Sequence, residues 1–296
     1  MHPTLHPFPA DVTGLRPVLD AISAELAAAG IESASVDAEL LAAHVLGVSR
    51  GRVQLLSATG TDLGPEDAAR LRAAVARRAA REPLQHITGT AAFRHLELAV
   101  GPGVFVPRPE TESVAQIAID AARAVPAPEP VVVDLGTGSG AIALSVATEV
   151  PNARVHAVEN SPEAFIWARA NQRRVEAHNA RMVFASLEDA LPELDGTVDV
   201  LVSNPPYIPL GAIPRDPEVR LYDPAAALYS GVDGMDAIRG VSRSGLRLLR
   251  DGGALIIEHG DEQGATVREV LRADGWRAVA THRDLTLRDR TTTAIR

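Results

Sequence analysis

The stretch that decides the fold is residues 131–140, with the sequence VVVDLGTGSG. Its first half is an apolar, β-branched run typical of a buried strand, and its second half is a glycine-rich turn that leads into a helical pattern. Glycines tolerate positive φ and let the backbone approach a ligand closely. In open α/β sheets, nucleotides bind at such loops beyond the carboxyl ends of strands. The stretch therefore predicts a nucleotide-type site, and the alternative is an ordinary tight connection between strand and helix.

The spacing of this loop and the acid that follows it narrow the class of ligand. G-x-G-x-G differs from the G-x-G-x-x-G fingerprint of dinucleotide-binding folds, and it is not a phosphate loop of the G-x-x-x-x-G-K-[S/T] type. Glu159 ends the next predicted strand, 19 residues after Gly140 (159 − 140). An acid at about this distance can accept hydrogen bonds from ribose hydroxyls. Loop and acid together indicate an adenosine-type ligand, without separating a nicotinamide cofactor from S-adenosylmethionine.

Strands and helices alternate through the C-terminal two thirds of the chain. This alternation predicts a parallel, doubly wound α/β sheet. A helix is expected at residues 141–150, and strands are expected at 131–135, 154–158, 198–203, 254–258, 276–281 and 292–295.

The N-terminal part has a different character, because it is rich in alanine and lacks strand signals. Apolar residues recur there at helical spacing, and glycine or proline follows each such segment. Helices are therefore expected at residues 14–30, 35–46 and 65–81.

A short stretch separates the helical part from the α/β part. Residues 87–100 carry β-branched residues in loose alternation, which predicts a hairpin. The glycines and prolines of residues 101–112 prevent regular structure until a helix begins near Pro109. We therefore expect a helical domain at residues 1–85, a hairpin linker at 86–106 and an α/β domain at 107–296.

Composition and charge exclude several classes of protein. The formal net charge of −9 over 296 residues weighs against a general nucleic-acid binder. The absence of cysteine excludes disulfides, thiolate zinc sites and cysteine nucleophiles. No ligand spacing suggests a metal site, so none is expected. Residues 1–11 lack the apolar region of a signal peptide, and no apolar run is long enough to span a bilayer, so we expect a soluble cytoplasmic protein.

The segment Asn204-Pro205-Pro206-Tyr207 directly follows the strand predicted at 198–203. Two prolines fix two φ angles and remove two backbone donors, so the local carbonyls are free to accept hydrogen bonds. Asn204 adds a side-chain acceptor, and Tyr207 adds a flat aromatic face. These features suit a planar NH2 group, and the alternative is an ordinary proline turn at a sheet edge.

Asn-Pro-Pro-Tyr is similar to the signature of methyltransferases that act on planar amino or amide nitrogens, such as DNA adenine N6-methyltransferases and protein glutamine N5-methyltransferases. Further segments favour the second group, and the likeness covers nearly the whole chain. The sequence resembles the release factor glutamine methyltransferase (PrmC/HemK) family at residues 93–98, 105–112, 134–143, 203–208, 258–260 and 283–284. The form of residues 107–110, Pro-Arg-Pro-Glu, is closer to the release factor branch than to the ribosomal-protein branch.

This resemblance implies a Rossmann-like class I methyltransferase domain with a seven-stranded, mostly parallel sheet, preceded by a small helical domain and a β-hairpin. It implies S-adenosylmethionine as the cofactor and S-adenosylhomocysteine as the product. The implied methyl acceptor is the side-chain N5 of the glutamine in the Gly-Gly-Gln motif of class I peptide chain release factors, which act in translation termination. The helical domain would grip this partner, and we expect a monomer with no nucleic-acid or membrane partner.

Site residues follow from the resemblance position by position. Those implied for the cofactor are Gly136, Thr137, Gly138, Ser139 and Gly140 along the loop, Glu159 at the ribose, Leu187 at the adenine, and Asn204. Those implied for the substrate are Asn204 and Pro205, which would accept from the amide, and Pro206 and Tyr207, which would shape the glutamine slot. The sequence departs from the family at Glu159, where aspartate is frequent, and at Ser186, where an acid is frequent.

Three alternatives remain open at this point. The first is a glutamine methyltransferase of a ribosomal protein, the second is a nucleic-acid adenine N6-methyltransferase, and the third is a non-catalytic protein that kept the fold. A separate question concerns the arginines of the third predicted helix. We expect them to form a solvated face, and the alternative is a contact with the partner protein; they are Arg72, Arg77, Arg78 and Arg81.

Overall fold

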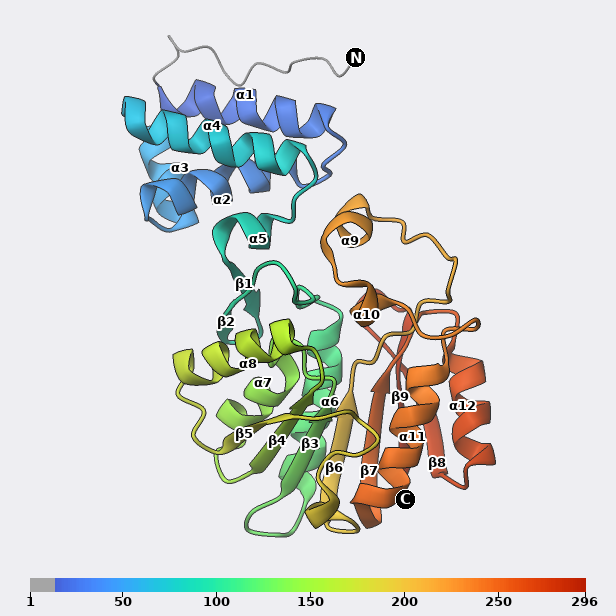
Figure 1. Ribbon diagram of the computed structural model, residues 1–296. Helices are drawn as coiled ribbons and strands as arrows, with labels where there is room; N and C mark the ends of the chain where they lie inside the picture. The colour runs from blue at the N-terminus through green and yellow to red at the C-terminus, as the bar shows by residue number, and fades with distance from the viewer. Residues whose placement is uncertain (1–13) are drawn as a thin grey trace. The chain divides into compact units, whose positions relative to one another are not determined.

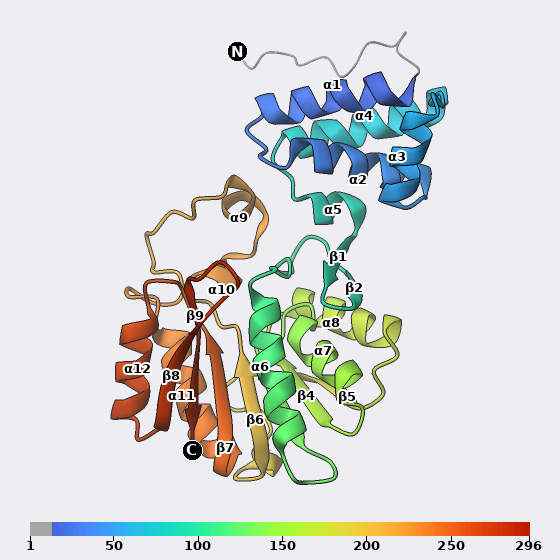
Figure 2. The same cartoon turned by 180° about the vertical axis from the view of Figure 1, so that it is seen from behind.

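The computed structural model describes residues 14–296, so the expectations for residues 1–13 lie outside it. The chain forms two compact units (Figure 1, with the reverse view in Figure 2). One unit contains the described residues up to Gly89 together with Pro214–Tyr222, and the other contains Thr90–Ile213 and Asp223–Arg296. This division differs from the predicted one in two respects. Residues 214–222 were assigned to the α/β domain, but they cluster with the helical unit, and residues 86–106, expected as a separate linker, are divided between the two units after Gly89.

The helical unit is built on one apolar core. Fully buried side chains such as Ile22, Leu41 and Leu71 come from three different helices and pack together. The three helices expected from the sequence are confirmed, whereas α3, α5 and α9 were not predicted. The helices are α1 (Leu15–Ala28), α2 (Ala34–Leu46), α3 (Arg50–Ala58), α4 (Pro65–Ala79), α5 (Leu84–Thr88) and α9 (Pro217–Tyr222).

An ion-pair network ties α9 to the rest of the helical unit. Arg78 on α4 donates from Nε to Asp37 Oδ2 at 2.7 Å and from Nη1 to Glu218 Oε1 at 2.8 Å. Arg81 donates from Nη2 to the other oxygen of Glu218 at 2.6 Å. The expectation of a solvated arginine face is therefore wrong for Arg78, which is 7% exposed, and for Arg81, which is partly buried in the same network. Arg77 remains exposed and pairs with Glu82.

The α/β unit contains a seven-stranded sheet in the order β5-β4-β3-β6-β7-β9-β8. Pairing is parallel from β5 through β7, and β9 runs antiparallel to both of its neighbours. The predicted doubly wound α/β fold is confirmed. The strands are β3 (Val131–Leu135), β4 (Arg154–Glu159), β5 (Ala180–Phe184), β6 (Val198–Ser203), β7 (Leu249–Glu258), β8 (Arg277–Arg283) and β9 (Asp289–Ile295).

Helices cover both faces of this sheet, and alternate residues of each strand face opposite cores. On β3, for example, Val132 packs with α6 and α7, whereas Val133 packs with α11 and α12. The helices are α6 (Thr111–Ala124), α7 (Ala141–Glu149), α8 (Pro162–Arg174), α10 (Ala225–Leu228), α11 (Asp236–Leu248) and α12 (Gly264–Ala273), with a 3-10 turn at Pro192–Leu194.

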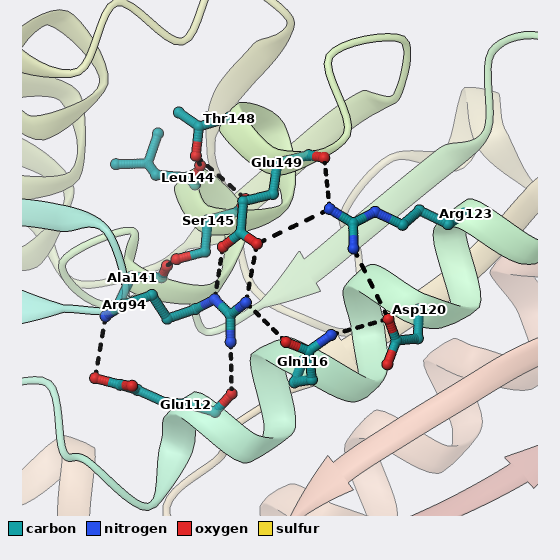
Figure 3. A network of polar contacts seen from close by, with 10 residues as sticks. All are labelled: Arg94, Glu112, Gln116, Asp120, Arg123, Ala141, Leu144, Ser145, Thr148 and Glu149. Atoms are coloured by element: carbon teal, nitrogen blue, oxygen red, sulfur yellow. Dashed lines mark hydrogen bonds and ion pairs between the residues drawn. The ribbon is translucent and has the colours of Figure 1, made fainter.

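The predicted hairpin is confirmed as β1 (Thr90–Phe93) and β2 (Leu96–Ala99), and its tip is anchored by Arg94 (Figure 3). The Arg94 guanidinium donates to both carboxylate oxygens of Glu149 on α7, at 2.6 and 2.9 Å, and to Gln116 Oε1 on α6 at 2.9 Å. Glu112 accepts from the Arg94 backbone N–H at 3.0 Å. Hydrogen bonding from Arg94 lowers the pKa of Glu149, so this pair stays charged and holds the hairpin against two helices.

Candidate functional site

Four chain segments meet at the carboxyl ends of the central parallel strands. The glycine loop follows β3, Glu159 ends β4, the Asn-Pro-Pro-Tyr segment follows β6 and Glu258 ends β7. The Ser203 hydroxyl, which is fully buried, donates to the Leu135 carbonyl at 2.6 Å. This bond fixes the last residue of β6 to the last residue of β3. The sequence features that were predicted separately are thus brought to one edge of the sheet.

Within the glycine loop, two glycines leave open space. Gly136 has φ of 72° and Gly138 has φ of 58°, and no atom of the described chain would lie within 4 Å of a Cβ at either position. Gly140 differs, because a Cβ there would meet Leu144 Cδ1 at 2.9 Å. The first two glycines therefore keep a surface free, while the third allows the loop to pack against its own helix.

The polar side chains of the loop point inward. Thr137 is 7% exposed and donates its hydroxyl to Asp134 Oδ2 at 2.6 Å. Ser139 is 3% exposed, and its carbonyl accepts from Asn171 Nδ2 at 2.9 Å. A ligand at this loop therefore meets backbone and glycine surface rather than these two hydroxyls.

Glu159 shapes the loop from the neighbouring strand. Its Oε2 accepts from the Gly138 N–H at 2.8 Å, and its Oε1 accepts from the N–H groups of Asn160 and Ser161 at 2.9 and 2.8 Å. A carboxylate offers about four acceptor positions, so these three bonds leave about one for a ligand hydroxyl. Glu159 is thus both a brace for the loop and an acceptor with remaining capacity.

Asp134 is a buried acid beside the loop with unused hydrogen-bonding capacity. Its side chain is 1% exposed, and its Oδ1 has no hydrogen-bond partner among residues 14–296. Burial raises the pKa of Asp134 to about 7, against the opposing hydrogen bonds from Thr137 and the Ala143 N–H. The sequence reasoning had assigned no role to this residue.

Leu187 and Ser186 lie on the loop that follows β5. Leu187 is half-buried against the core of the α/β unit, and its Cδ1 lies 3.0 Å from the position of a Cβ built on Gly240 of α11. Ser186 donates to Asp189 Oδ2 at 3.0 Å, which brings an acid close to the position where the family often has one. Contact of Leu187 with adenine stays a prediction.

The Asn-Pro-Pro-Tyr segment has few donors of its own, and one of its acceptors is in use, because the Tyr207 carbonyl accepts from Gln263 Nε2 at 3.0 Å. Asn204 is half-buried, and its Nδ2 donates to Thr111 Oγ1 at 3.3 Å. Its Oδ1 accepts no hydrogen bond from residues 14–296. Pro205 and Pro206 have no N–H, and Ser203 already uses its hydroxyl, so Asn204 Oδ1 and the Pro205 carbonyl remain available as acceptors.

Glu258 forms a polar cluster beneath this segment. Its side chain is 1% exposed, and its Oε2 has no hydrogen-bond partner in residues 14–296. Burial raises its pKa to about 7, while hydrogen bonding from Thr111, the positive charge of Arg290 and hydrogen bonding from Tyr207 favour the charged form. Burial also raises the pKa of Tyr207, so its hydroxyl stays protonated.

The segment that precedes α6 has a scaffold role that the sequence did not disclose. Arg108 donates from Nη2 to Asp223 Oδ2 at 2.6 Å, and its guanidinium lies 4.9 Å from the centre of the Phe105 ring. Both partners belong to the α/β unit. The pair holds the irregular residues 105–110 in place, so that Thr111 at the start of α6 reaches Asn204.

Two family models and several known proteins match the chain. The family model described as PrmC N-terminal domain matches residues 18–89, and the methyltransferase small domain model matches residues 99–214. The release factor glutamine methyltransferase of Streptomyces coelicolor is 52% identical over 271 residues, which cover 91% of this chain and 93% of the relative. That of Mycolicibacterium smegmatis is 49% identical and covers 96% and 99% of the two chains.

The chain belongs to the release factor glutamine methyltransferase family. The family resemblance drawn from the sequence is therefore confirmed, as are the predicted enzyme class and cofactor: this member of the family is an S-adenosylmethionine-dependent methyltransferase. A further relative is named 4-amino-L-phenylalanine/4-methylamino-L-phenylalanine methyltransferase, from Streptomyces pristinaespiralis; it is 41% identical and covers 95% of each chain. Within residues 14–296, no helix combines the length and apolar character needed to cross a membrane.

Proposed function

We propose that the protein transfers a methyl group from S-adenosylmethionine to the side-chain amide nitrogen of the glutamine in the Gly-Gly-Gln motif of class I peptide chain release factors. The observation that carries the proposal is the Asn204–Pro205 acceptor pair, fixed at the end of β6 next to the glycine loop of β3 by the Ser203–Leu135 hydrogen bond. Identity of about half over nearly the full length of relatives named for this reaction supports the choice of substrate.

The cofactor would lie along the glycine loop. The open space beside Gly136 and Gly138 fits a ligand that approaches the backbone closely, and Glu159 retains an acceptor position for a ribose hydroxyl. We further propose that Leu187 packs on the adenine. Thr137 and Ser139 would contribute through their backbone, because their side chains are buried.

The amide nitrogen gains a methyl group and loses one proton; an N-protonated amide is very acidic, so this proton can pass to water, and the protein's main task is alignment. An amide nitrogen is a weak nucleophile because its lone pair is delocalised, whereas S-adenosylmethionine when bound supplies an electrophilic methyl group on a sulfonium. Asn204 Oδ1 and the Pro205 carbonyl would accept the two amide hydrogens, which aims the nitrogen and raises its electron density. Positioning of this kind contributes about 7 to 11 kcal/mol in favourable systems. Pro206 and the Tyr207 ring would form the walls of the slot.

We propose that the helical unit binds the release factor. Its inclusion of α9 supports this role, because α9 is joined to the Asn-Pro-Pro-Tyr segment by only the short stretch 208–216. A release factor bound at the helical unit could therefore contact α9, which lies close in sequence to the residues of the substrate slot. We further propose that the protein acts as a monomer in the cytoplasm.

A second candidate is methylation of an aromatic amine of a small molecule. The relative named for 4-amino-L-phenylalanine favours it, because an aromatic amine and an amide both present a partly planar NH2 to the same pair of acceptors. A ribosomal-protein glutamine and the adenine N6 of a nucleic acid share this chemistry as well. The net charge of −9 disfavours the nucleic acid.

The substrate is tested by competition between these acceptors. The full-length enzyme is incubated with S-adenosylmethionine carrying a labelled methyl group and, separately, with a purified class I release factor, ribosomal proteins, duplex DNA and 4-amino-L-phenylalanine. We expect rapid labelling of the release factor, and mass spectrometry of its peptides should place one methyl group on the Gly-Gly-Gln glutamine. A release factor in which this glutamine is replaced by alanine is the matched control. Labelling of another acceptor without the release factor would overturn the proposal.

A further inference from the structure

The main chain of the Asn-Pro-Pro-Tyr segment is held at its two ends. Its two prolines have no N–H, and in the proposed slot the Asn204 oxygen and the Pro205 carbonyl are left for the substrate. The first end is fixed by Ser203, whose hydroxyl donates to the Leu135 carbonyl at 2.6 Å. The second end is the peptide group that follows Tyr207, and a different side chain holds it.

Gln263, directly before α12, holds this second end. Its Nε2 donates to the Tyr207 carbonyl at 3.0 Å, and its Oε1 accepts from the Gly260 N–H at 2.9 Å. A carbonyl can only accept and a backbone N–H can only donate, so these two partners allow one orientation of the Gln263 amide. The side chain thus ties the Asn-Pro-Pro-Tyr segment to the turn that follows β7.

The surroundings of the Tyr207 carbonyl fit this single donor closely. Gly234 is buried with φ of 76°, and a Cβ there would lie 2.3 Å from the Tyr207 oxygen and 2.9 Å from Gln263 Nε2. Only glycine leaves both atoms in place. The N–H of the same peptide group belongs to Ile208 and donates to the Leu228 carbonyl at 2.8 Å. This peptide group is therefore held on both sides, and Gln263 supplies the bond to its oxygen.

We propose that Gln263 is a positioning residue for methyl transfer: by holding the Tyr207 carbonyl, it fixes the end of the Asn-Pro-Pro-Tyr segment and keeps the acceptors of the slot aligned on the substrate NH2. Because both proline φ angles are already fixed, this bond leaves few free torsions between the two held ends. The inference rests on the proposed function, since it concerns the slot for the acceptor nitrogen. Gln263 was not among the predicted site residues, because Tyr207 lies 56 residues away in the chain.

Gln263→Met in the full-length enzyme tests this role. Methionine has a similar length but cannot donate to the Tyr207 carbonyl. We expect kcat for release factor methylation to fall by about tenfold to a hundredfold, because small misplacements of reacting groups have effects of this size. KM for the release factor and Kd for S-adenosylmethionine should stay close to the wild-type values, since Gln263 acts only through Tyr207. An unchanged kcat, or a loss confined to KM or Kd, would overturn the proposal.

Gln172→Met is the matched control. Gln172 on α8 is also half-buried in the α/β unit, and its Nε2 donates to the Ala180 carbonyl. Ala180 is the first residue of β5, so this bond lies at the edge of the sheet opposite to the carboxyl ends of the parallel strands. The kcat of Gln172→Met should stay at the wild-type value. An equal fall of kcat in both methionine variants would attribute the effect to general destabilisation and would overturn the positioning role.

Gln263→Glu separates the two hydrogen bonds of this side chain. At neutral pH a carboxylate can still accept from the Gly260 N–H, but it has no proton to donate to the Tyr207 carbonyl. The variant therefore keeps one bond and replaces the other with two oxygens that repel each other. We expect its kcat to be at least as low as that of Gln263→Met. A wild-type kcat in Gln263→Glu would show that the bond to Tyr207 is not needed and would contradict the proposal.

A substrate-independent measurement separates this inference from the proposed function. The Ile208 N–H shares its peptide group with the Tyr207 carbonyl, so its exchange with solvent, followed by nitrogen-15 NMR, reports how firmly that group is held. Exchange should be faster in Gln263→Met and unchanged in Gln172→Met. Unchanged exchange in Gln263→Met would refute the inference even if the release factor is methylated. Faster exchange would support it even if another planar NH2 proves to be the acceptor.

Discussion

Substitution of Gly136 by alanine tests the cofactor site, and the same substitution at Gly196 is the control. Gly136 and Gly196 both belong to the α/β unit and are both exposed. Their φ angles are 72° and 68°, and no atom of the described chain lies within 4 Å of a Cβ built at either position. Each also donates its N–H to a carbonyl at 2.9 Å, Val158 for Gly136 and Arg247 for Gly196. The two differ in location, because only Gly136 lies in the loop proposed to bind S-adenosylmethionine.

The magnitudes follow from this comparison. An alanine in the left-handed region costs about 1 to 2 kcal/mol, so both variants should lose that much free energy of unfolding. In Gly136→Ala the new methyl group also projects into the open space where the cofactor would approach. Crowding by one methyl group costs about 1 to 3 kcal/mol. That energy corresponds to a Kd for S-adenosylmethionine that is about 5-fold to 150-fold higher.

Two measurements test whether S-adenosylmethionine binds along this loop. Chemical denaturation of the cofactor-free variants should give similar losses of stability for Gly136→Ala and Gly196→Ala. Isothermal titration with S-adenosylmethionine should show weakened binding for Gly136→Ala and wild-type binding for Gly196→Ala. Wild-type affinity in Gly136→Ala would refute the placement of the cofactor along this loop, and equal weakening in both variants would attribute the effect to general destabilisation.

Three further predictions concern stability. Arg94→Met should lower the free energy of unfolding by about 3 kcal/mol in urea denaturation, because it leaves the poorly exposed carboxylate of Glu149 without its bidentate partner; a loss below about 0.5 kcal/mol would contradict the anchoring role. Arg78→Met should cost about 3 to 5 kcal/mol by the same assay, because Asp37 is left charged and buried, and a wild-type midpoint would speak against it. Burial raises the folded-state pKa of Asp134 from 3.8 to about 7. The contribution of Asp134 to the free energy of unfolding is therefore complete below about pH 4 and is lost as the pH rises through 7. Asp134→Asn should flatten that part of the plot of stability against pH, and an unchanged slope would exclude Asp134 as its source.

The sequence predicted the α/β fold well because its central strands are strongly patterned. The strand of the glycine loop is apolar over several consecutive residues, as expected for a strand covered on both faces. Strand β5 was not among the predicted strands, since it lies at the sheet edge and only Ala180 of its five residues is buried. Helix α3 was not predicted for a similar reason, because its only buried residues are Val53 and Ser57.

The features that the sequence did not disclose depend on contacts between distant residues. Helix α9 clusters with the helical unit, where Glu218 pairs with Arg78, 140 residues away in the chain. The same arginine was expected in solvent, because helical spacing alone cannot show that an acid from a distant segment will cover it. A local pattern reports which residues share one helix face, but not what that face meets.

In the candidate site, too, features with a local sequence pattern could be predicted, and contacts between distant residues could not. The glycine loop and the Asn-Pro-Pro-Tyr segment have local signatures, and both could be found from sequence. The hydrogen bond between Asn204 and Thr111 spans 93 residues, so no local pattern could disclose it. Glu159 was expected to bind the ribose, and the structure shows in addition that its carboxylate accepts three backbone hydrogen bonds from the glycine loop and the next turn.

The central claim is that Asn204 presents its side-chain oxygen to the glutamine amide of a release factor. The most direct measurement is methyl transfer to an intact class I release factor by the wild-type enzyme and by Asn204→Ala, with S-adenosylmethionine binding measured for both by calorimetry. We expect one methyl group on the Gly-Gly-Gln glutamine with the wild type, and at least a hundredfold lower kcat for Asn204→Ala, on the order of the loss seen when one preorganised hydrogen-bonding group is removed. Near-normal methylation by Asn204→Ala would contradict the account.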